Sequence, residues 1–289
     1  MIGSFTPLEV ARLEETRQAR GTVALIDRLM ETDPSIDYAF EWIADGAMTF
    51  AGPGNWANQT AGVGLHGEIS DDDLDRLVDF FTSRGVEPKI EVASFAHESL
   101  IAGLQQRGFG LREFEHVWAL DLTNEANLDP SLEQAIDASV SIDEVPRDDD
   151  ATIRAFAVTT TSGFVPAGAD DAFIESLYRQ AEQIARFEQC DAFIARVDGE
   201  LAGGGGMETN HGVVALFGAS VLPPFRRRGA QTALILARLR RGRARGAKIG
   251  VIHSKPGIPT ERNAARLGFQ LAYVKAIMAM PGEGLIRSM

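Results

Sequence analysis

The sequence is poor in the residues that build disulfide-bonded or metal-bound frameworks. Its 289 residues include one cysteine, Cys190, so an internal disulfide is excluded and a cluster of thiolate metal ligands cannot form. The five histidines are never four positions apart, the spacing that places two imidazoles on one face of a helix. We therefore expect no metal site.

Long apolar runs and excess positive charge are also missing. No run of about 18 apolar residues occurs, so neither a transmembrane helix nor a membrane partner is expected. The first 20 residues contain no apolar signal-peptide core, and together with the single cysteine this indicates a cytoplasmic protein. The formal net charge of -13 argues against general binding of nucleic acid. The remaining composition is typical of a globular protein.

The chain reads as two copies of one α/β unit. Shifted by 160 positions, residues 90–94 lie on 250–254, and both copies continue with a helix, a Gly-Phe pair and a strand. Residues 123–138 between the copies are polar and lack a pattern. We predict a domain at 1–122, a linker at 123–138 and a domain at 139–289, each with a mixed sheet flanked by helices. The alternative is that the first domain is unrelated to the second.

A hairpin is expected in the second copy. Asp198-Gly199 separates two strand-like segments and suits the positive φ angles of a type I′ turn. Four glycines follow at positions 203–206, but no helix comes after them. We expect a bulged strand or a close backbone approach there, and no phosphate loop.

The densest positive charge lies in residues 223–235, PPFRRRGAQTALI, between an apolar strand and a predicted helix. The first turn of a helix leaves backbone N–H groups without partners, and the helix dipole adds about half a positive charge there. Two small residues, Gly229 and Ala230, let the backbone approach a ligand closely, and the three arginines before them can donate charge-assisted hydrogen bonds. This pattern indicates a phosphate-binding loop.

Two other interpretations of the basic segment remain open. Nine basic residues and no acidic one lie between Arg226 and Lys248, which is also typical of a solvated helix face. A nucleic-acid-binding helix is the second alternative. It would call for aromatic partners, and the sequence has none between Phe225 and Phe269.

The segment VLPPFRRRGAQTAL at 221–234 resembles the acyl-CoA signature of the Gcn5-related N-acetyltransferases (GNAT): a strand, V-x-P, then R-x-x-G-x-G/A and a helix. Gln231 stands where the family has glycine or alanine. Downstream, PTERNAARLGF at 259–269 resembles the family's helix that carries an asparagine, here Asn263, and ends in Gly-Phe. The positions that match the first signature are Val221, Pro223, Arg226 and Gly229.

The resemblance implies a function. Backbone amides from Arg228 to Thr232 would hold the pyrophosphate of acetyl-CoA, and the pantetheine arm would run between the strands that end at Val221 and His253. The acetyl group would pass to an amine of a small molecule or peptide. The cofactor-binding residues that the resemblance implies are Val221, Arg226, Arg227, Arg228, Gly229, Ala230, Gln231, Thr232 and Asn263.

The first copy lacks this loop. At the equivalent place it has LHGEISDDD, residues 65–73, in which Ser70 suits a helix N-cap and three aspartates fill the first turn. Carboxylates in that turn would repel a pyrophosphate. We therefore expect the first domain to be a degenerate copy that does not bind coenzyme A.

The catalytic groups are less well defined. The family's tyrosine position is Ala264 here, and the strand VVALFGAS has no carboxylate. Glu208 could activate a water molecule as a base and Tyr273 could protonate the thiolate, although a solvated strand end and a structural tyrosine are the alternatives. His253, a lone histidine, is expected to be structural. A non-catalytic acyl-CoA-binding regulatory protein and a nucleic-acid binder through residues 226–248 remain alternative functions.

Overall fold

The computed structural model of the chain describes residues 1–128, 130–165 and 168–288. Asp129, in the expected linker, lies outside the described residues. The backbone forms two compact units, which we call unit 1 and unit 2. No helix in the described ranges is long and apolar enough to span a bilayer. Unit 1 comprises Met1–Trp118, Ser254–Glu261 and Gln270–Met289, and unit 2 comprises Ala119–His253 and Arg262–Phe269.

Unit 1 is a mixed sheet with the strand order β1-β2-β3-β4-β11-β5. Three helices accompany it. The last three residues of β5 belong to unit 2. The elements are α1 (Pro7–Thr32), β1 (Ala39–Ile43), β2 (Gly46–Phe50), β3 (Gln59–Ala61), α2 (Asp71–Thr82), β4 (Lys89–Ala93), α3 (Glu98–Gln106), β5 (Gly110–Asp121) and β11 (Gln270–Ala279).

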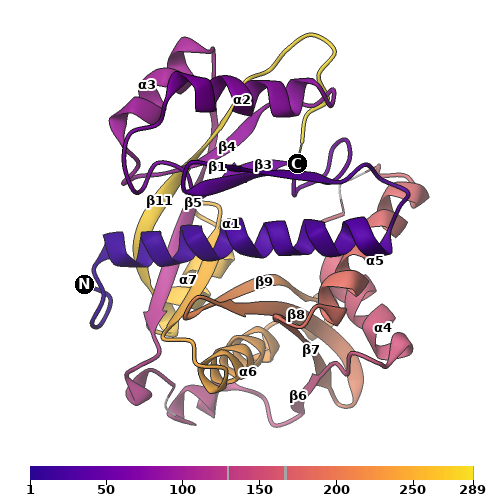
Figure 1. Cartoon of the computed structure of the whole chain (residues 1–289). Helices are drawn as coiled ribbons and strands as arrows, with labels where there is room; N and C mark the ends of the chain where they lie inside the picture. The colour runs from indigo at the N-terminus through magenta and orange to yellow at the C-terminus, as the bar shows by residue number, and fades with distance from the viewer. Residues whose placement is uncertain (129, 166–167, 289) are drawn as a thin grey trace. The chain divides into compact units, whose positions relative to one another are not determined.

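The helices of unit 1 cover both faces of its sheet, with α1 on one face and α2 and α3 on the other (Figure 1). Neighbouring residues of a strand point to opposite faces. Along β2, Ala47 packs with Ala19 of α1, whereas Met48 packs in the cluster that contains Leu74 and Leu77 of α2. Each face of the sheet is therefore buried by its own helix layer.

Unit 2 is built around the strands β10-β9-β8-β7-β6. β10 runs parallel to β9, and the other neighbours are antiparallel. The elements are η1 (Glu125–Leu128), η2 (Pro130–Ala135), β6 (Val140–Glu144), α4 (Asp150–Thr161), α5 (Asp171–Arg186), β7 (Cys190–Val197), β8 (Glu200–Asn210), β9 (Val213–Val221), η3 (Pro223–Phe225), α6 (Ala230–Ala244), β10 (Ile249–Ser254) and α7 (Pro259–Arg266). Ser254 of β10 and the first three residues of α7 belong to unit 1.

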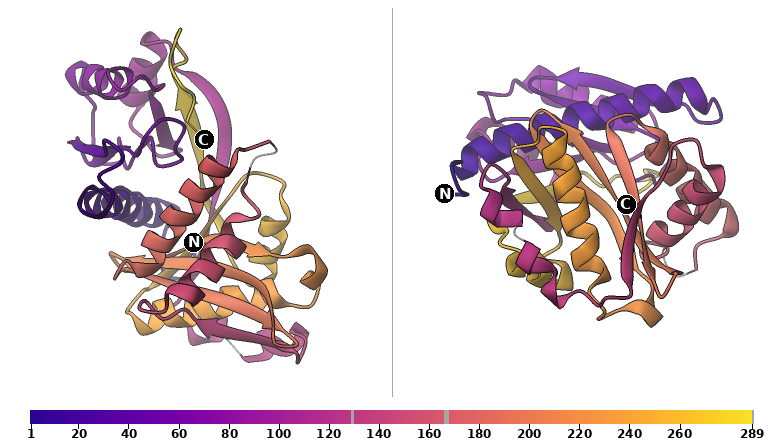
Figure 2. Two further views of the ribbon diagram at one scale, coloured as in Figure 1. Left: turned by 90° about the vertical axis from the view of Figure 1, so that its right-hand side faces the viewer. Right: turned by 90° about the horizontal axis from the view of Figure 1, so that it is seen from below.

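Helices α4 and α6 lie on opposite faces of the unit 2 sheet (Figure 2). A side chain at Gly204 would come within 2.9 Å of Thr160 on α4, whereas one at the next residue, Gly205, would come within 2.9 Å of Arg238 on α6. α5 packs with α4, and the two share a cluster with β7 that includes Ile153, Ala185 and Ile194. The sheet is thus enclosed on both sides.

The expected hairpin and glycine strand are confirmed. Asp198 and Gly199 have φ angles of 53° and 82° between β7 and β8. The four glycines continue β8, and no helix follows them. A Cβ atom at Gly206 would lie 2.4 Å from the ring of Phe217, and one at Gly203 would lie 2.6 Å from the carbonyl oxygen of Ser220. Glycine is required because the neighbouring atoms leave no room for a side chain.

The two Gly-Phe turns repeat each other in detail. The glycines, Gly108 and Gly268, have φ angles of 82° and 85° and follow the ends of α3 and α7. Each Phe N–H donates to the carbonyl oxygen five residues earlier, and the bonds coincide after a shift of 160 positions. They join Phe109 to Leu104 at 3.0 Å and Phe269 to Ala264 at 3.1 Å.

The compact units nevertheless differ from the two domains expected at 1–122 and 139–289. β11, which follows the second Gly-Phe turn, pairs antiparallel with β4, from Lys275 opposite Ala93 to Ala279 opposite Lys89. It therefore belongs to unit 1, whereas the end of β5, residues 119–121, belongs to unit 2. Hydrogen-bond partners across a sheet decide where a strand belongs, and sequence proximity does not.

Candidate functional site

The N-terminus of α6 is open. Gly229 occupies the N-cap in the left-handed conformation, with φ at 89°, and no side chain caps the helix. The basic loop that precedes it also contains Arg227 with a positive φ of 68°. Backbone N–H groups of a first helical turn have no intrahelical acceptor, so this end can receive an anion.

The equivalent end in unit 1 is closed. Ser70 is the N-cap of α2, as predicted, and its Oγ accepts from the backbone N–H of Asp73 at 3.2 Å. Asp71, Asp72 and Asp73 place carboxylates in the first turn, and Arg107 binds Asp71 at 3.1 Å. A side-chain cap and acidic residues occupy the place that an anion would need.

The three arginines of the loop have different surroundings. Arg226 and Arg227 are exposed, and within the described residues neither forms an ion pair. The Nε of Arg226 donates to the carbonyl oxygen of Val221 at 3.0 Å, which ties the loop to the end of β9. These two guanidinium groups carry the unneutralised positive charge of the loop.

Arg228 is directed elsewhere, in contrast to the expectation that all three arginines serve an anion. Its guanidinium donates to Asp198 at 2.9 Å, to Ser139 Oγ at 2.7 Å and to Asp137 at 3.3 Å. The Ser139 backbone N–H, its hydroxyl and Arg228 together lower the pKa of Asp137 to about 2. The side chain of Arg228 therefore anchors the loop to neighbouring segments of unit 2.

The other arginines of the basic run are neutralised along α6. Four of them form ion pairs with carboxylates from other parts of unit 2, and a fifth, Arg238, is buried. The positive charge of these arginines is therefore paired with carboxylates or buried, in contrast to that of Arg226 and Arg227. The pairs are Arg240–Glu133, Arg241–Glu144, Arg241–Asp191, Arg243–Glu125 and Arg245–Asp191.

A bulge changes the course of β9 just before the loop. β9 pairs with β10 only from Val213 to Leu216. Its ladder with β8 then shifts, so that two residues of β9, Gly218 and Ala219, oppose Gly205 of β8, and Gly218 has a φ of 55°. Beyond the bulge β9 continues to Val221 beside β8 without pairing to β10. Among the described residues, the outer half of β9, residues 217–221, is therefore paired with β8 along one edge and not with β10 along the other.

The motif residues of α6 and α7 meet in unit 2. The side-chain amide of Asn263 donates to Gln231 Oε1 at 2.5 Å, and Asn263 Oδ1 accepts from Arg266. Ala230 is buried in the first turn and Thr232 is half-buried. The side chain of Gln231 is therefore drawn toward α7 rather than across the helix end.

The two catalytic candidates lie in different units. Glu208 is on β8, opposite Ala215 and so next to Leu216, where β9 separates from β10; it is 9% exposed. Tyr273 is on β11 in unit 1, and its hydroxyl donates to Glu15 Oε1 at 2.6 Å. Burial and the Glu15 carboxylate raise the pKa of Tyr273 well above 10.0. Its proton is therefore held more firmly than that of an ordinary tyrosine.

Two residues of the site were not predicted from the sequence. Gly218 forms the bulge, and a glycine inside an apolar strand was the available signal. Arg238 is 1% exposed, and helical periodicity indicates this because it lies four residues after the buried Leu234. No cluster of three or more potential metal ligands occurs in the part of the chain that the structure describes.

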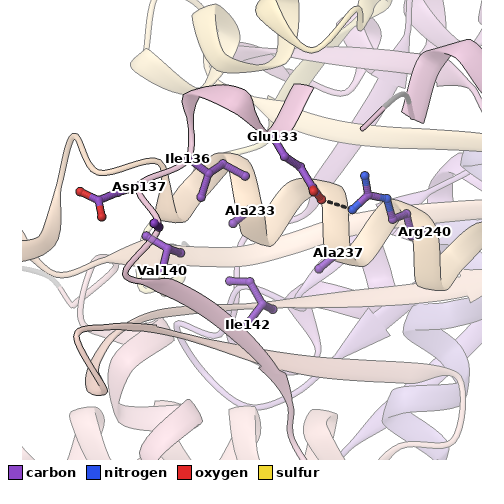
Figure 3. Close-up of a pocket in the computed structure, with 9 residues that line it drawn as sticks. Glu133, Ile136, Asp137, Val140, Ile142, Ala233, Ala237 and Arg240 are labelled. Atoms are coloured by element: carbon purple, nitrogen blue, oxygen red, sulfur yellow. Dashed lines mark hydrogen bonds and ion pairs between the residues drawn. The ribbon is translucent and has the colours of Figure 1, made fainter. Parts of the chain in front are cut away.

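A separate pocket of about 380 Å³ lies against α6 (Figure 3). Its lining combines apolar and polar groups, and the Glu133–Arg240 ion pair lies at its edge. Asp137 points away from the other labelled side chains. The pocket contains none of the predicted catalytic residues. It is lined by Glu133, Ile136, Asp137, Ala138, Val140, Ile142, Ala233, Ala237 and Arg240.

Comparison with known proteins relates part of the chain to a family and the fold to solved structures. Residues 156–269 match the family model of the acetyltransferase (GNAT) family. Among solved structures, the chain is similar to a GCN5-related N-acetyltransferase from Kribbella flavida, with a TM-score of 0.63, 15% identity and coverage of 92% of this chain and 96% of that chain. No curated protein sequence matches the chain.

Two further structures share the fold. A functionally unknown conserved protein from Staphylococcus epidermidis has a TM-score of 0.59 at 13% identity, covering 86% of this chain and 96% of that one. A tandem GNAT protein from the clavulanic acid biosynthesis pathway has a TM-score of 0.55 at 16% identity, covering 70% and 67%. The chain therefore contains, at residues 156–269, a domain of the GNAT family of acetyltransferases.

Proposed function

We propose that the protein is an N-acetyltransferase that binds acetyl-CoA at the N-terminus of α6. The observation that supports this most strongly is the distribution of charge along the basic run. The arginines of α6 are paired or buried, whereas Arg226 and Arg227 remain exposed beside an uncapped helix end. An anion is the ligand that such a surface favours.

The pyrophosphate of acetyl-CoA fits this surface. The first-turn N–H groups from Ala230 to Thr232 would bind its oxygens, Arg226 and Arg227 would add charge-assisted hydrogen bonds, and Gly229 lets the backbone approach. The pantetheine arm would follow the outer half of β9, whose second edge is not paired with β10. Acetyl-CoA supplies an activated acyl group, and a neutral amine of a small molecule or peptide would accept it.

Glu208 is the better supported of the two catalytic residues that we propose. An ammonium group must lose a proton to become the neutral amine that attacks the thioester, and a carboxylate can remove that proton through a water molecule. As the C–N bond forms the C–S bond breaks, and the coenzyme A thiolate that leaves takes up a proton. Glu208 lies where β9 and β10 separate. Tyr273 is the weaker proposal, because its hydroxyl already donates to Glu15.

A non-catalytic acyl-CoA-binding regulator is the second candidate. It is favoured by Ala264, which is fully buried where the family has its tyrosine. Turnover of acetyl-CoA with a panel of amines separates the two candidates. An enzyme would release free thiol when the correct amine is present, whereas a regulator would bind acetyl-CoA without releasing thiol.

Calorimetric titration with acetyl-CoA tests the proposal directly. We expect one site per chain, because the α2 end in unit 1 is capped by Ser70 and carries carboxylates. Two sites would contradict the assignment of unit 1 as a degenerate copy. Absence of binding would contradict the acetyltransferase proposal itself.

The variant Gly229→Glu should lose acetyl-CoA binding while the protein remains folded. It places a carboxylate where the pyrophosphate is proposed to bind. The glutamate backbone at position 229 must also adopt the left-handed conformation, with φ at 89°. A residue other than glycine is strained there, so a control must introduce the same strain elsewhere.

Gly246→Glu is that control, because Gly246 follows the other end of α6, has a φ of 88° and has open space around it. It introduces the same charge and a similar strain, and it should bind acetyl-CoA like the unaltered protein. Equal affinities of the two variants for acetyl-CoA would refute the phosphate-loop assignment.

A further inference from the structure

Arg238 is a buried cation without an acidic partner. Its side chain is 1% exposed within unit 2, and among the described residues it forms no ion pair with a carboxylate. Its hydrogen bonds go to three backbone carbonyl oxygens: Leu234 of its own helix at 2.9 Å, Gly206 at 2.9 Å and Phe217 at 3.3 Å. Burial lowers the pKa of the guanidinium to about 9, so the group remains charged at neutral pH.

The carbonyl groups that Arg238 binds lie beside the bulge. Gly206 and Phe217 are the last residues paired across β8 and β9 before the ladder shifts. A bulge removes regular ladder partners, and buried backbone groups require replacements. Burying an unpaired charge is unfavourable unless hydrogen bonds compensate for lost hydration. The guanidinium of Arg238 therefore supplies donors to the carbonyl oxygens beside the bulge, and these oxygens compensate the buried charge for its lost hydration.

The strands are shaped to admit the guanidinium. A Cβ atom at Gly205 would lie 2.9 Å from Cζ and from one terminal nitrogen of Arg238. Gly205 also lies opposite the bulge, where β9 has two residues and β8 has one. A side chain there would displace the guanidinium. The glycine at position 205 is therefore needed for the guanidinium of Arg238 to reach the bulge.

We propose that Arg238 is a positioning residue for the acyl-CoA site. Its hydrogen bonds to the carbonyl oxygens of Gly206 and Phe217 fix the position of the outer half of β9, Phe217–Val221. The edge of this segment that is not paired with β8 is then available to the pantetheine arm. The ligand in this inference rests on the proposed function. The action on β9 itself rests only on the contacts described above.

The test combines hydrogen exchange with ligand affinity in four variants. Arg238→Met removes the charge and the donors, Arg238→Lys keeps the charge, and Gly205→Ala displaces the guanidinium without removing it. Arg240→Met is the matched control, because it removes an arginine two positions away that pairs with Glu133, which is 46% exposed. Acetyl-CoA is compared with ADP, which carries a diphosphate without the pantetheine arm.

In Arg238→Met we expect amide exchange to rise about tenfold in residues 217–221. Acetyl-CoA affinity should fall about three- to tenfold, the value of one or two hydrogen bonds, whereas ADP affinity stays unchanged. Arg238→Lys should recover part of both losses, and Arg240→Met should match the unaltered protein. Should Arg238→Met not fold, Arg238→Lys and Gly205→Ala should show the same selective loss to a smaller degree.

Two results would overturn the inference. One is unchanged exchange in residues 217–221 of the Arg238 variants. The other is an equal loss of acetyl-CoA and ADP affinity, which indicates general destabilisation. If the unaltered protein binds neither ligand, the proposed function fails, and the exchange measurement alone then decides whether Arg238 holds β9.

Discussion

At the scale of single residues, Asp137 holds the end of the arginine loop in place through its contacts with Arg228. Its carboxylate accepts from the backbone N–H and the hydroxyl of Ser139, at 2.9 Å and 2.7 Å, and from Arg228. The backbone N–H of Asp137 also donates to the carbonyl oxygen of Arg228 at 3.1 Å. The loop is thus joined to the segment before β6 by contacts of one aspartate.

We expect Asp137 to titrate near pH 2 in the folded protein, below its ordinary 3.8. A pKa lowered by folding stabilises the protein above the unfolded value, and the contribution is lost as the pH falls from about 4 to about 2. Arg228→Met should raise the pKa only part of the way, because Ser139 still donates. Carboxyl titration by NMR measures this, and a midpoint of 3.8 in the unaltered protein would contradict the contacts described.

At the scale of elements, the C-terminal half of α6 is attached to β7 through Asp191. The side chain of Asp191 is fully buried and binds Arg147 at 3.0 Å, Arg241 at 3.3 Å and Arg245 at 2.7 Å. Three guanidinium groups therefore meet at one buried carboxylate, and Arg241 also pairs with Glu144 at 3.2 Å. Their own exposed fractions are 25–39%, so water reaches them in part.

Asp191→Asn should lower the free energy of unfolding of unit 2 by roughly 2–3 kcal/mol, less than a fully buried ion pair would lose, because the arginines are partly hydrated. Glu133→Gln is the control. It removes the exposed partner of Arg240, which is also on α6. The free energy of unfolding should change by less than about 1 kcal/mol. Denaturation in urea, followed by a probe in unit 2, compares them, and equal effects would show that Asp191 is not the anchor.

At the scale of the whole chain, unit 1 contains the last strand of the sequence. β11 lies beside β4, and its Lys275 is fully buried between Glu15 at 2.8 Å and Glu91 at 3.0 Å, with a further bond to Gln18. Residues more than 250 positions apart thus share one polar network. The packing of unit 1 therefore depends on residues that follow unit 2 in the chain.

Lys275→Met should destabilise unit 1 by about 3–5 kcal/mol, because it leaves two buried carboxylates without their cation. Amide exchange should rise in β4 and β11 and change little in β7 and β8. Lys255→Met is the control, since Lys255 is 68% exposed and pairs with Glu113 on the surface of unit 1. Faster exchange in β7 and β8 alone would contradict the assignment of β11 to unit 1.

Features that depend on neighbouring residues could be predicted from the sequence. The Ser70 cap and the Gly-Phe turns rest on hydrogen bonds that span at most five residues, and the Asp198-Gly199 turn rests on the positive φ angles of two adjacent residues. The arginine loop and its glycine also form one short segment. Short-range backbone geometry is encoded by the residue types present, so these patterns indicated the correct structures.

Features that depend on partners distant in the chain could not be predicted. Nothing near Arg228 indicates that Asp137 and Asp198 bind it, and nothing near Tyr273 indicates Glu15, 258 positions away. The position of β11 between β4 and β5 likewise depends on strands that lie far from it in the sequence. Such pairings are selected by the burial of whole faces and charges, a property of the folded chain rather than of any one segment.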